Sequence, residues 1–524
     1  MSMQPEYQQG LSPSRESIYG PPRQAGRAMA PPPASSTESG FGANALGRGR
    51  LGVGSLIFFT VSASAPMTVL AGGVTTTFAV TGVIGVPLAF PIIAVVLGLF
   101  AVGYAAMSRH VVNAGVFYAY ISQGLGGAWG TAASFVALVS YNAIQIGLYG
   151  LFGAVAAQFI NPKAGVSWSW VAYAFIAMAV VAVLGLLKVD LNAKLLAVLL
   201  VAEVIAVVLF DAAGFVHPAG GSVSIAGLNP HNLFISGIGG VFAFTIAAYI
   251  GFESAGDYAE EAKDPRRTVG RSLAATVVIT GVLYTVSAWA LSVGVGATQV
   301  VGATQQQGPG VIFGLITQHY GTTVGDIANV LLMTSVFAAL LSFHNTVARY
   351  VFAAGRERVL PRFMAHTSAT TKSPFVGSLS QTICAVVVIV VFSLKHQDPV
   401  ASLFTWFSYL AALGVLLLML GTAVANGVFL NRRGSGENVW QRTIAPTLAA
   451  ICLAGVTYVT AANANALLGT EKGSNLQYIL PGIVVGAALV GVLWGLTLRS
   501  SKPDVYDAIG RGGPSEQLLG GDTY

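Results

Sequence analysis

The chain has 524 residues, of which 54% are hydrophobic and only 9% are charged, and its formal net charge is +6. Soluble globular domains carry about 25% charged residues, so this composition excludes an ordinary soluble protein. The apolar residues form runs of about twenty or more, each long enough to cross a bilayer core as a helix. Because unpaired backbone groups are too costly in lipid, we expect an all-α membrane protein.

A disordered cytoplasmic tail is expected at residues 1–48, which are rich in Pro, Gly, Ser and Gln and show no signal-peptide pattern. The membrane domain is expected at 49–498, followed by a second, similarly unstructured cytoplasmic tail at 499–524. A short helix is expected at 309–320, after a loop rich in Gly and Gln. Twelve membrane helices are predicted near 52–77, 82–107, 126–157, 168–187, 190–211, 233–257, 270–297, 325–355, 375–395, 400–430, 443–463 and 477–498.

Lysine and arginine are distributed unevenly around these spans. All but three of the 26, namely Lys163, Lys395 and Lys472, fall on one side of the predicted membrane. Positive residues favour the cytoplasmic side, so we expect a multi-pass protein of the plasma (inner) membrane, in contact with membrane lipid and with both termini in the cytoplasm. Since these residues account for the positive charge, no nucleic-acid partner is expected.

An internal repeat relates the first span to the sixth. Residues 51–65 (LGVGSLIFFTVSASA) and 236–250 (SGIGGVFAFTIAAYI) match at a constant offset, with glycine, phenylalanine, threonine and alanine at shared positions. Five spans separate the copies, and an odd number inverts the second copy in the membrane, as in many secondary transporters. We therefore expect two inverted five-helix repeats, at about 51–211 and 233–430, and two C-terminal helices at about 443–498.

Both repeated spans carry residues that interrupt a helix. Span 1 contains Ser-Ala-Ser-Ala before Pro66, and proline removes a backbone donor and disturbs the preceding turn. A half-helix resuming there would direct free N–H groups at a carboxylate. Span 6 contains Gly251 between Tyr249 and Phe252, and carbonyls freed at that break suit an ammonium group. Each interruption alone is also explained by packing, but matching positions in two repeats favour a binding site at broken helices 1 and 6.

Span 3 carries Tyr141, Asn142, Gln145 and Tyr149, whose spacing places them on one helical face. A polar stripe in lipid should face the protein interior. It indicates either a wall of a substrate cavity or a set of hydrogen bonds between helices.

Glu203 lies halfway along span 5, in LLAVLLVAEVIAVVLF. A charge at that depth is costly, so the side chain must be protonated, paired or in a cavity. We interpret it as a proton- or cation-coupling residue; a neutral glutamate bonded to a neighbouring helix is the alternative. Span 8 presents Ser335, Ser342, Asn345 and Arg349, mostly on one helical face, as possible partners, and we assign Ser342 to the coupling role together with Glu203.

The segment after the span 6 break is acidic and then basic, from Glu253 and Asp257 to Arg267. Residues 260–267 are interpreted as a solvated helix end, and a gate that includes Glu253 is the alternative. Elsewhere, the two cysteines lie in apolar runs and no HExxH-type spacing occurs, so we expect no metal and no cofactor. The sequence shows no nucleophile–base pair and no phosphate-binding loop, so we do not expect an enzyme.

Three motifs resemble those of the amino acid–polyamine–organocation (APC) superfamily: GFESA followed by EEAKDPRRT at 251–268, NAGVFYAY at 113–120 and RYVFAAGRERVLP at 349–361. The resemblance implies two inverted five-helix repeats. It implies that the substrate carboxylate binds Ala63 to Met67, that the ammonium binds carbonyls of Ser62 and 247–250, and that Phe252 is an aromatic gate beside Glu253. The candidate substrate-binding residues are Ser62, Ala63, Ser64, Ala65, Met67, Tyr141, Gln145, Ala247, Ala248, Tyr249, Ile250 and Phe252.

Two departures accompany the resemblance. Many members have Gly-Ser-Gly or similar at the span 1 break, whereas this chain has Ser-Ala-Ser-Ala-Pro, and Glu203 stands where several members have a lysine. The resemblance implies a secondary active amino acid transporter, and we expect uptake coupled to a proton or another ion by alternating access. An amine or polyamine carrier, an amino acid exchanger and a non-transporting sensor are the alternatives.

Overall fold

The computed structural model describes residues 46, 49–187, 189–433, 436–470 and 474–512. Within them the chain is helical, and its bridge between Leu51 and Ala262 belongs to no strand. Eleven described helices are long and apolar enough to cross a membrane. The remaining predicted span, 168–187, corresponds to the shorter apolar helix Trp170–Gly185. The all-α membrane fold is confirmed, whereas the expected tail at 1–48 lies almost wholly outside the described residues.

The first predicted repeat contains five spans, the first of them in pieces. The pieces are α1 (Val53–Ser64), α2 (Pro66–Thr68), a π-helical turn (Val69–Val74) and α3 (Thr75–Thr81). The remaining helices are α4 (Val86–Met107), the short α5 (Val116–Leu125), α6 (Gly127–Ala164), α7 (Trp170–Gly185) and α8 (Val189–Val216).

The second predicted repeat also begins with an interrupted span. It contains α9 (Pro230–Leu233), α10 (Ile238–Ala247), 3-10 turns at Phe252–Gly256 and Ala259–Glu261, α11 (Pro265–Val295), α12 (Val300–Gln307), α13 (Gly310–Tyr320), α14 (Thr322–Arg356), α15 (Phe375–Leu394) and α16 (Thr405–Arg433). The chain continues with α17 (Ala445–Ala462), α18 (Ala464–Leu468), α19 (Leu476–Ser501) and α20 (Pro503–Ala508). The repeat boundaries at about 51–211 and 233–430 stay a prediction.

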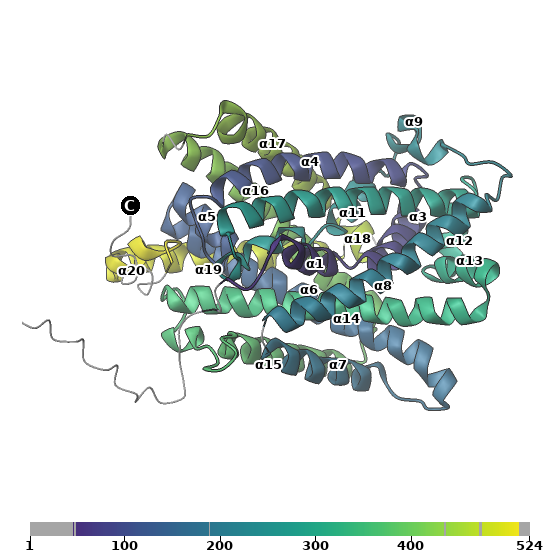
Figure 1. Ribbon diagram of the computed structural model, residues 1–524, viewed down its shortest axis with the longest axis horizontal. Coiled ribbons are helices and arrows are strands. Elements are labelled where there is room, and N and C mark those ends of the chain that lie inside the picture. Colours follow the sequence, from purple (N-terminus) through teal and green to yellow (C-terminus); the bar gives the residue numbers. More distant parts are fainter. Residues whose placement is uncertain (1–45, 47–48, 188, 434–435, 471–473, 513–524) are drawn as a thin grey trace, which may run out of the picture. The chain divides into compact units, whose positions relative to one another are not determined.

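Helix α1 lies in the middle of the bundle (Figure 1). It packs against α8, α11 and α14, and the turn at Phe252–Gly256 also contacts it. Helices α4 and α11 run side by side, and α6 packs against α14, α16 and α19. Both interrupted spans are therefore enclosed by long helices, which can supply partners for the backbone groups that the interruptions leave free.

The structure corrects two expectations about segments outside the spans. The loop after α11 contains a helix, α12, because Val300 and Thr304 are buried on its side toward α3. The chain after Arg499 is not an unstructured tail up to Gly512. It forms α20, whose Val505 is buried, and Ile509 that follows is buried as well.

Candidate functional site

The first helix break lies at Ala65. Helix α1 ends at Ser64, Ala65 has φ +45° and ψ +71°, and α2 begins at Pro66. A left-handed alanine is strained by about 1–2 kcal/mol. The break is stabilised by the Ala65 N–H, which donates to the carbonyls of Val61 and Ser62, and by burial of Ala65. The predicted interruption of span 1 is confirmed in position.

The second break lies beside the first. Helix α10 ends at Ala247, and the turn that follows reaches Gly251, where φ is +106°. A Cβ at Gly251 would lie 2.6 Å from the Cβ of Ala63 and 3.0 Å from its carbonyl carbon. Glycine is required there both by the dihedral angle and by the close approach of the two backbones. The two predicted breaks therefore meet in the interior.

A cavity of ≈ 660 Å³ begins at the two breaks. From the breaks it is lined by Ala63, Ser64, Ala65, Ala247, Ala248 and Ile250. Its other walls come from α6, α14 and α16 and are mainly apolar, and it reaches Gln158 of α6 and Gln307 of α12. Among the described residues that line it, none carries a charge. Six of the twelve candidate substrate residues thus face one uncharged cavity.

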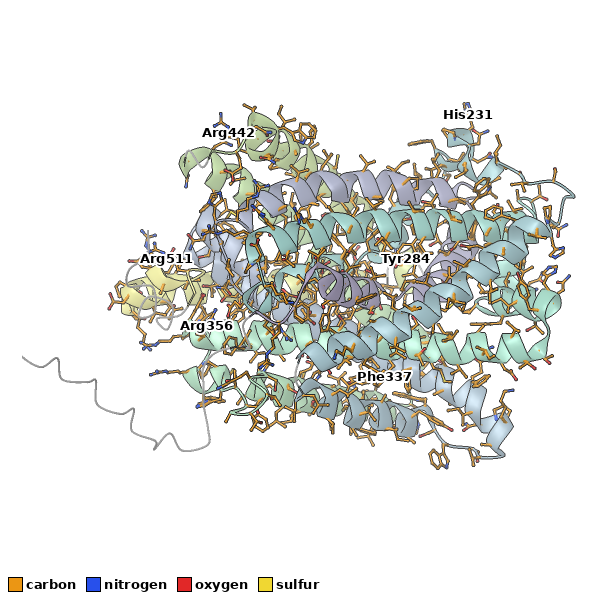
Figure 2. All side chains as sticks on the ribbon, viewed as in Figure 1. His231, Tyr284, Phe337, Arg356, Arg442 and Arg511 are labelled. Atoms are coloured by element: carbon orange, nitrogen blue, oxygen red, sulfur yellow. The ribbon has the colours of Figure 1, made fainter. Side chains whose placement is uncertain are left out.

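The cavity lies toward one end of the bundle, away from most of the positive charge. Figure 2 shows Arg356, Arg442 and Arg511 toward the end where α20 lies, and His231 toward the other. We call the first the basic end and the second the opposite end. Helices α12 and α13, which contribute Gln307 and Phe313 to the cavity wall, lie at the opposite end (Figure 1).

Glu203 of α8 is fully buried against the first break. Its Oε1 accepts a hydrogen bond from the Met67 N–H at 2.5 Å and another from the Ser335 hydroxyl at 2.6 Å. The Thr68 N–H donates to the same serine oxygen at 3.3 Å. Oε2 of Glu203 has no hydrogen-bond partner among the described residues. The carboxyl group therefore occupies the positive end of the half-helix that begins at Pro66.

Of the possible partners on span 8, Ser335 binds Glu203, and Ser342, which we assign to the coupling role from the sequence alone, does not. Ser342 donates to the carbonyl of Phe59 in α1 at 3.1 Å, whereas Ser335 binds the carboxyl group. The two serines are seven residues apart on α14, so about 10 Å separates them along the helix axis. Sequence spacing placed both on one face but did not indicate which turn of α14 meets α8.

The polar stripe of α6 makes hydrogen bonds between helices. Tyr141 donates to Oε1 of Glu253 at 2.8 Å, and the Gly251 N–H donates to Oε2 at 2.9 Å. Gln145 lies 3.2 Å from Nδ1 of His344 and accepts a hydrogen bond from Gln381. Neither Tyr141 nor Gln145 lines the cavity. Their role as cavity walls is therefore not supported by this geometry.

Four further candidate residues also lie behind the cavity wall. Tyr249 donates to the carbonyl of Phe90 at 2.9 Å, and the ring of Phe252 packs edge-on against Phe100. Met67 donates to Glu203, and the buried hydroxyl of Ser62 has no hydrogen-bond partner among the described residues. These residues can shape the two breaks, and their contact with a substrate stays a prediction.

Between the breaks and the basic end, the bundle is closed by charge pairs and aromatic rings. Arg349 of α14 pairs with Glu261 at 2.6 Å, and both side chains are only 3% exposed. Tyr258 stacks on Phe59 of α1, with ring centroids 4.3 Å apart. The guanidinium group of Arg349 lies over the Tyr258 ring, 4.3 Å from its centroid. Burial raises the pKa of Glu261, and the Arg349 guanidinium opposes that shift. Residue 261 is thus not part of a solvated helix end, because its carboxylate is needed to neutralise a buried arginine.

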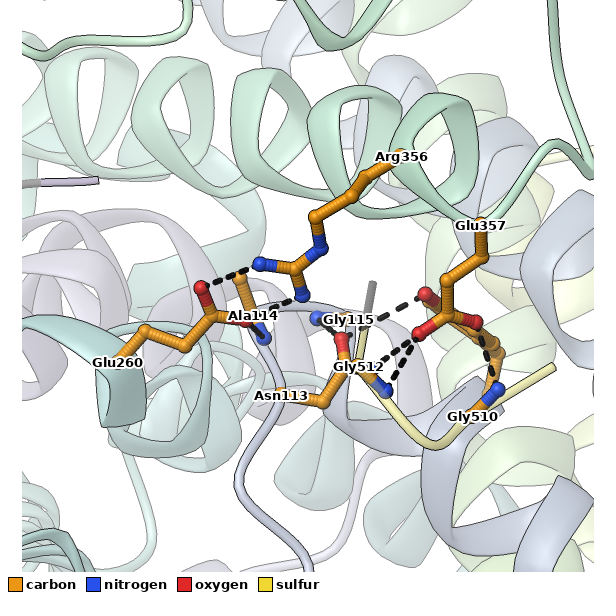
Figure 3. Close-up of polar contacts among 9 residues, drawn as sticks. Asn113, Ala114, Gly115, Glu260, Arg356, Glu357, Gly510 and Gly512 are labelled. Atoms are coloured by element: carbon orange, nitrogen blue, oxygen red, sulfur yellow. Dashed lines mark hydrogen bonds and ion pairs between the residues drawn. The ribbon is translucent and has the colours of Figure 1, made fainter. Parts of the chain in front are cut away.

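A second cluster at the basic end joins four separate segments (Figure 3). Arg356 binds both carboxylate oxygens of Glu260, at 2.6 and 2.7 Å, and Glu260 also accepts the Ala114 N–H. Glu357 accepts from the side chain of Asn113 at 2.6 Å and from the backbone N–H groups of Gly510 and Gly512. Glu357, in the third motif and itself bonded by Asn113, therefore holds the C-terminal segment, a contact that sequence reasoning missed.

Comparison with known proteins gives a match over most of the chain. The profile of the family described as "Amino acid permease" matches residues 51–489. The branched-chain amino acid permease BcaP of Lactococcus lactis subsp. cremoris is 27% identical over 437 residues, which cover 78% of this chain and 86% of that protein.

Two other relatives match less of the chain. The branched-chain amino acid permease BcaP of Bacillus subtilis is 24% identical over 331 residues, covering 58% of this chain and 67% of that protein. The putrescine transporter PotE of Haemophilus influenzae is 27% identical over 164 residues, covering 31% and 36%.

Proposed function

The chain belongs to the amino acid permease family, and we propose that it carries neutral amino acids with apolar side chains through the cavity between its two helix breaks. The observation that carries this proposal is the lining of that cavity. It joins backbone groups of both breaks, suited to an amino acid's ends, to apolar walls without a charged side chain among the described residues. We propose transport alone, without catalysis or a cofactor.

The wall chemistry favours an apolar side chain. Ile144, Leu148, Phe244, Phe313 and Phe343 face the cavity. Burial of apolar surface contributes about 25 cal/mol per Å², so a branched aliphatic side chain is stabilised by leaving water here. Two relatives in the comparison are named branched-chain amino acid permeases, which agrees with this chemistry.

A second candidate substrate class is amines, because one relative is named a putrescine transporter. Such a substrate carries positive charge away from its α-position, and an ammonium group taken out of water needs a carboxylate or several acceptors. The cavity offers hydroxyl and amide groups, such as those of Thr68 and Asn329, but no acid among its described lining residues. This chemistry favours the neutral substrate.

Coupling is proposed to run through Glu203. The ionised carboxylate accepts the Met67 N–H, one of the donors that a substrate carboxylate would use. A proton on Glu203 weakens that hold and frees the positive end of the half-helix for the substrate. Proton and substrate then promote each other's binding, because linkage between two sites is reciprocal. We therefore propose that uptake across the plasma membrane is coupled to proton entry through Glu203.

The proposed orientation places the basic end in the cytoplasm, since arginine and lysine favour that side. The cavity then faces the outside and the paired residues around Arg349 close the inside. In this arrangement the structure corresponds to an outward-facing state, in which a substrate enters from outside and the closed basic end must open before release.

The proposal is tested with purified protein in liposomes. An imposed proton gradient, acidic outside, should drive accumulation of leucine, isoleucine or valine, and excess lysine or putrescine should not compete. Glu203→Gln should abolish gradient-driven accumulation but retain substrate exchange. Asp326→Asn, a change at an exposed acid paired with Lys163, should behave as the unaltered protein.

Two results would contradict the proposal. Preferred transport of lysine or putrescine would overturn the substrate class. Undiminished gradient-driven accumulation by Glu203→Gln would overturn the coupling role.

A further inference from the structure

Helix α8 carries a second acidic residue inside its membrane span, Asp211. The residue is 8% exposed, and its Oδ2 accepts a hydrogen bond from the Ser287 hydroxyl of α11 at 3.1 Å. Its Oδ1 is buried without a hydrogen-bond partner among the described residues. A buried carboxyl group with one neutral donor is expensive in a membrane, and such groups mark ion or proton paths.

Asp211 lies between Glu203 and the opposite end of the bundle. Eight residues separate the two acids, which corresponds to about 12 Å along α8. Six residues beyond Asp211, the exposed His217 stacks on His319 of α13, with parallel rings whose centroids are 4.3 Å apart. Titratable groups therefore occur at the helix end, at an intermediate depth and at the first break.

Two hydroxyl groups of α11, those of Ser287 and Tyr284, lie between Asp211 and the first break. Ser287, which binds Asp211, lies one helical turn from Tyr284. Tyr284 donates to the carbonyl of Ser64 at 3.1 Å, at the first break, where Glu203 accepts the Met67 N–H. Figure 2 shows Tyr284 near the middle of the bundle. Side chains that can donate and accept protons therefore lie on α11 between Asp211 and the break beside Glu203.

We propose that Asp211 is a second proton-binding site, which receives a proton from the opposite end and passes it to Glu203 by way of Ser287 and Tyr284. The proton binds the free oxygen of Asp211, moves along the hydroxyl groups and ends on the free oxygen of Glu203. Asp211 returns to the carboxylate form, so charge and protons balance. This inference rests on the proposed proton coupling at Glu203.

Among the described residues, titratable groups on the helices packed against this part of α8 include Tyr284 of α11 and, on α13, His319 and Tyr320. His319 stacks on His217, and the Tyr320 hydroxyl donates to the carbonyl of Leu209. Asp326 of α14 is paired with Lys163. The competing explanation for Asp211 is structural, namely a hydrogen bond that ties α8 to α11.

The test is Asp211→Asn in liposomes, because asparagine keeps an acceptor for Ser287 but carries no titratable proton. Gradient-driven leucine accumulation should slow by about tenfold or more, while leucine exchange without net proton movement stays within about twofold. The pH profile of the initial rate should lose its acidic limb, and Asp211→Glu should restore it in part. Thr285→Val, on the same helix but facing the groove beside α4, is the matched control.

The outcomes separate this inference from the proposed function. Equal losses of accumulation and exchange with a lower melting temperature would show a structural role and overturn the relay. Unaltered accumulation and pH profile in Asp211→Asn would also overturn it, even if Glu203→Gln abolishes coupling. Retained coupling in Glu203→Gln would instead overturn the proposed function on which the relay rests.

Discussion

The two halves of the bundle, on either side of the helix breaks, are built from the same helices but from different chemistry. Toward the opposite end, α6, α10 and α14 line an uncharged cavity with Ala, Leu and Phe side chains. Toward the basic end, α14 and the segment after α10 form the buried pair Arg349–Glu261, and Phe59 of α1 stacks on Tyr258. The first half leaves space and the second fills it with specific contacts.

The difference shows how one bundle can close one end while leaving the other accessible. Apolar walls hold no fixed partner, so a substrate can replace the solvent between them. Charge pairs hold two spans in one arrangement, and a buried pair loses much of its stability when one partner leaves. Alternating access then requires that the pairs at the basic end separate. Variants of these pairs therefore test most directly whether they keep that end closed.

The largest effect is expected from Arg349→Met. Glu261 would keep a buried charge without its counter-ion, which destabilises a protein by about 3–5 kcal/mol. The melting temperature in detergent should fall strongly, and a reporter cysteine at the basic end should react faster. Lys163→Met removes an exposed partner whose side chain is 50% exposed, and should change stability by less than about 1 kcal/mol. Equal effects of the two substitutions would contradict the importance of the buried pair.

Gly251→Ala should have the next largest effect, because it alters the contact between the two breaks. The added Cβ would overlap Ala63, and the positive φ itself is unfavourable by about 1–2 kcal/mol for alanine. Leucine uptake should be nearly abolished with protein still present in the membrane. Gly54→Ala in α1 is the control, since its Cβ would meet nothing within 4 Å. Uptake above half of the unaltered rate would show that the breaks need not touch.

The breaks could be predicted from the sequence because their causes are local. Pro66 cannot continue a hydrogen-bonded helix, and Gly251 permits a dihedral angle that other residues avoid. The depth of Glu203 in the membrane could also be predicted, because it follows from the position of the residue within an apolar run. The matching positions of the two breaks then came from the repeat, and the structure places them in contact.

Partners across helices could not be predicted, because they depend on rotation and translation of whole helices. Ser342 and Ser335 share a face of α14, and only packing against α1 and α8 decides which reaches Glu203. The same holds for Tyr141, whose polarity fitted a cavity wall but whose hydroxyl binds Glu253. The docking of residues 509–512 had no local signal beyond a few apolar side chains.

A smaller effect is expected from Tyr141→Phe. Oε1 of Glu253 would lose its donor, and a buried acceptor left without a partner costs about 1–3 kcal/mol. The melting temperature should fall modestly, and labelling of the reporter cysteine at the basic end should increase. Tyr173→Phe removes a hydrogen bond between the start of α7 and Asn161, near the end of α6, and should leave that labelling unchanged. No difference between the two variants would exclude Glu253 as part of the closed end.

The smallest effect concerns Glu357 and depends on pH. Burial raises the pKa of Glu357, while the Gly510 N–H and the Arg356 guanidinium oppose the shift. The folded state therefore binds this proton more tightly than the unfolded chain, whose glutamate pKa is about 4.3. The contribution of Glu357 to stability is greatest below that value and declines as the pH rises through the raised pKa.

Glu357→Gln supplies the reference, because glutamine does not titrate. The melting temperature of the unaltered protein minus that of Glu357→Gln should decrease between about pH 4 and pH 8. The same comparison with Asp326→Asn, an exposed acid, should be nearly flat. Protection of residues 509–512 from carboxypeptidase should follow the same pH dependence, because Glu357 binds the N–H groups of Gly510 and Gly512. If this difference in melting temperature instead grew with pH, docking would stabilise the carboxylate form of Glu357. The hydrogen bonds to Glu357 in Figure 3 would then outweigh the cost of burying its charge.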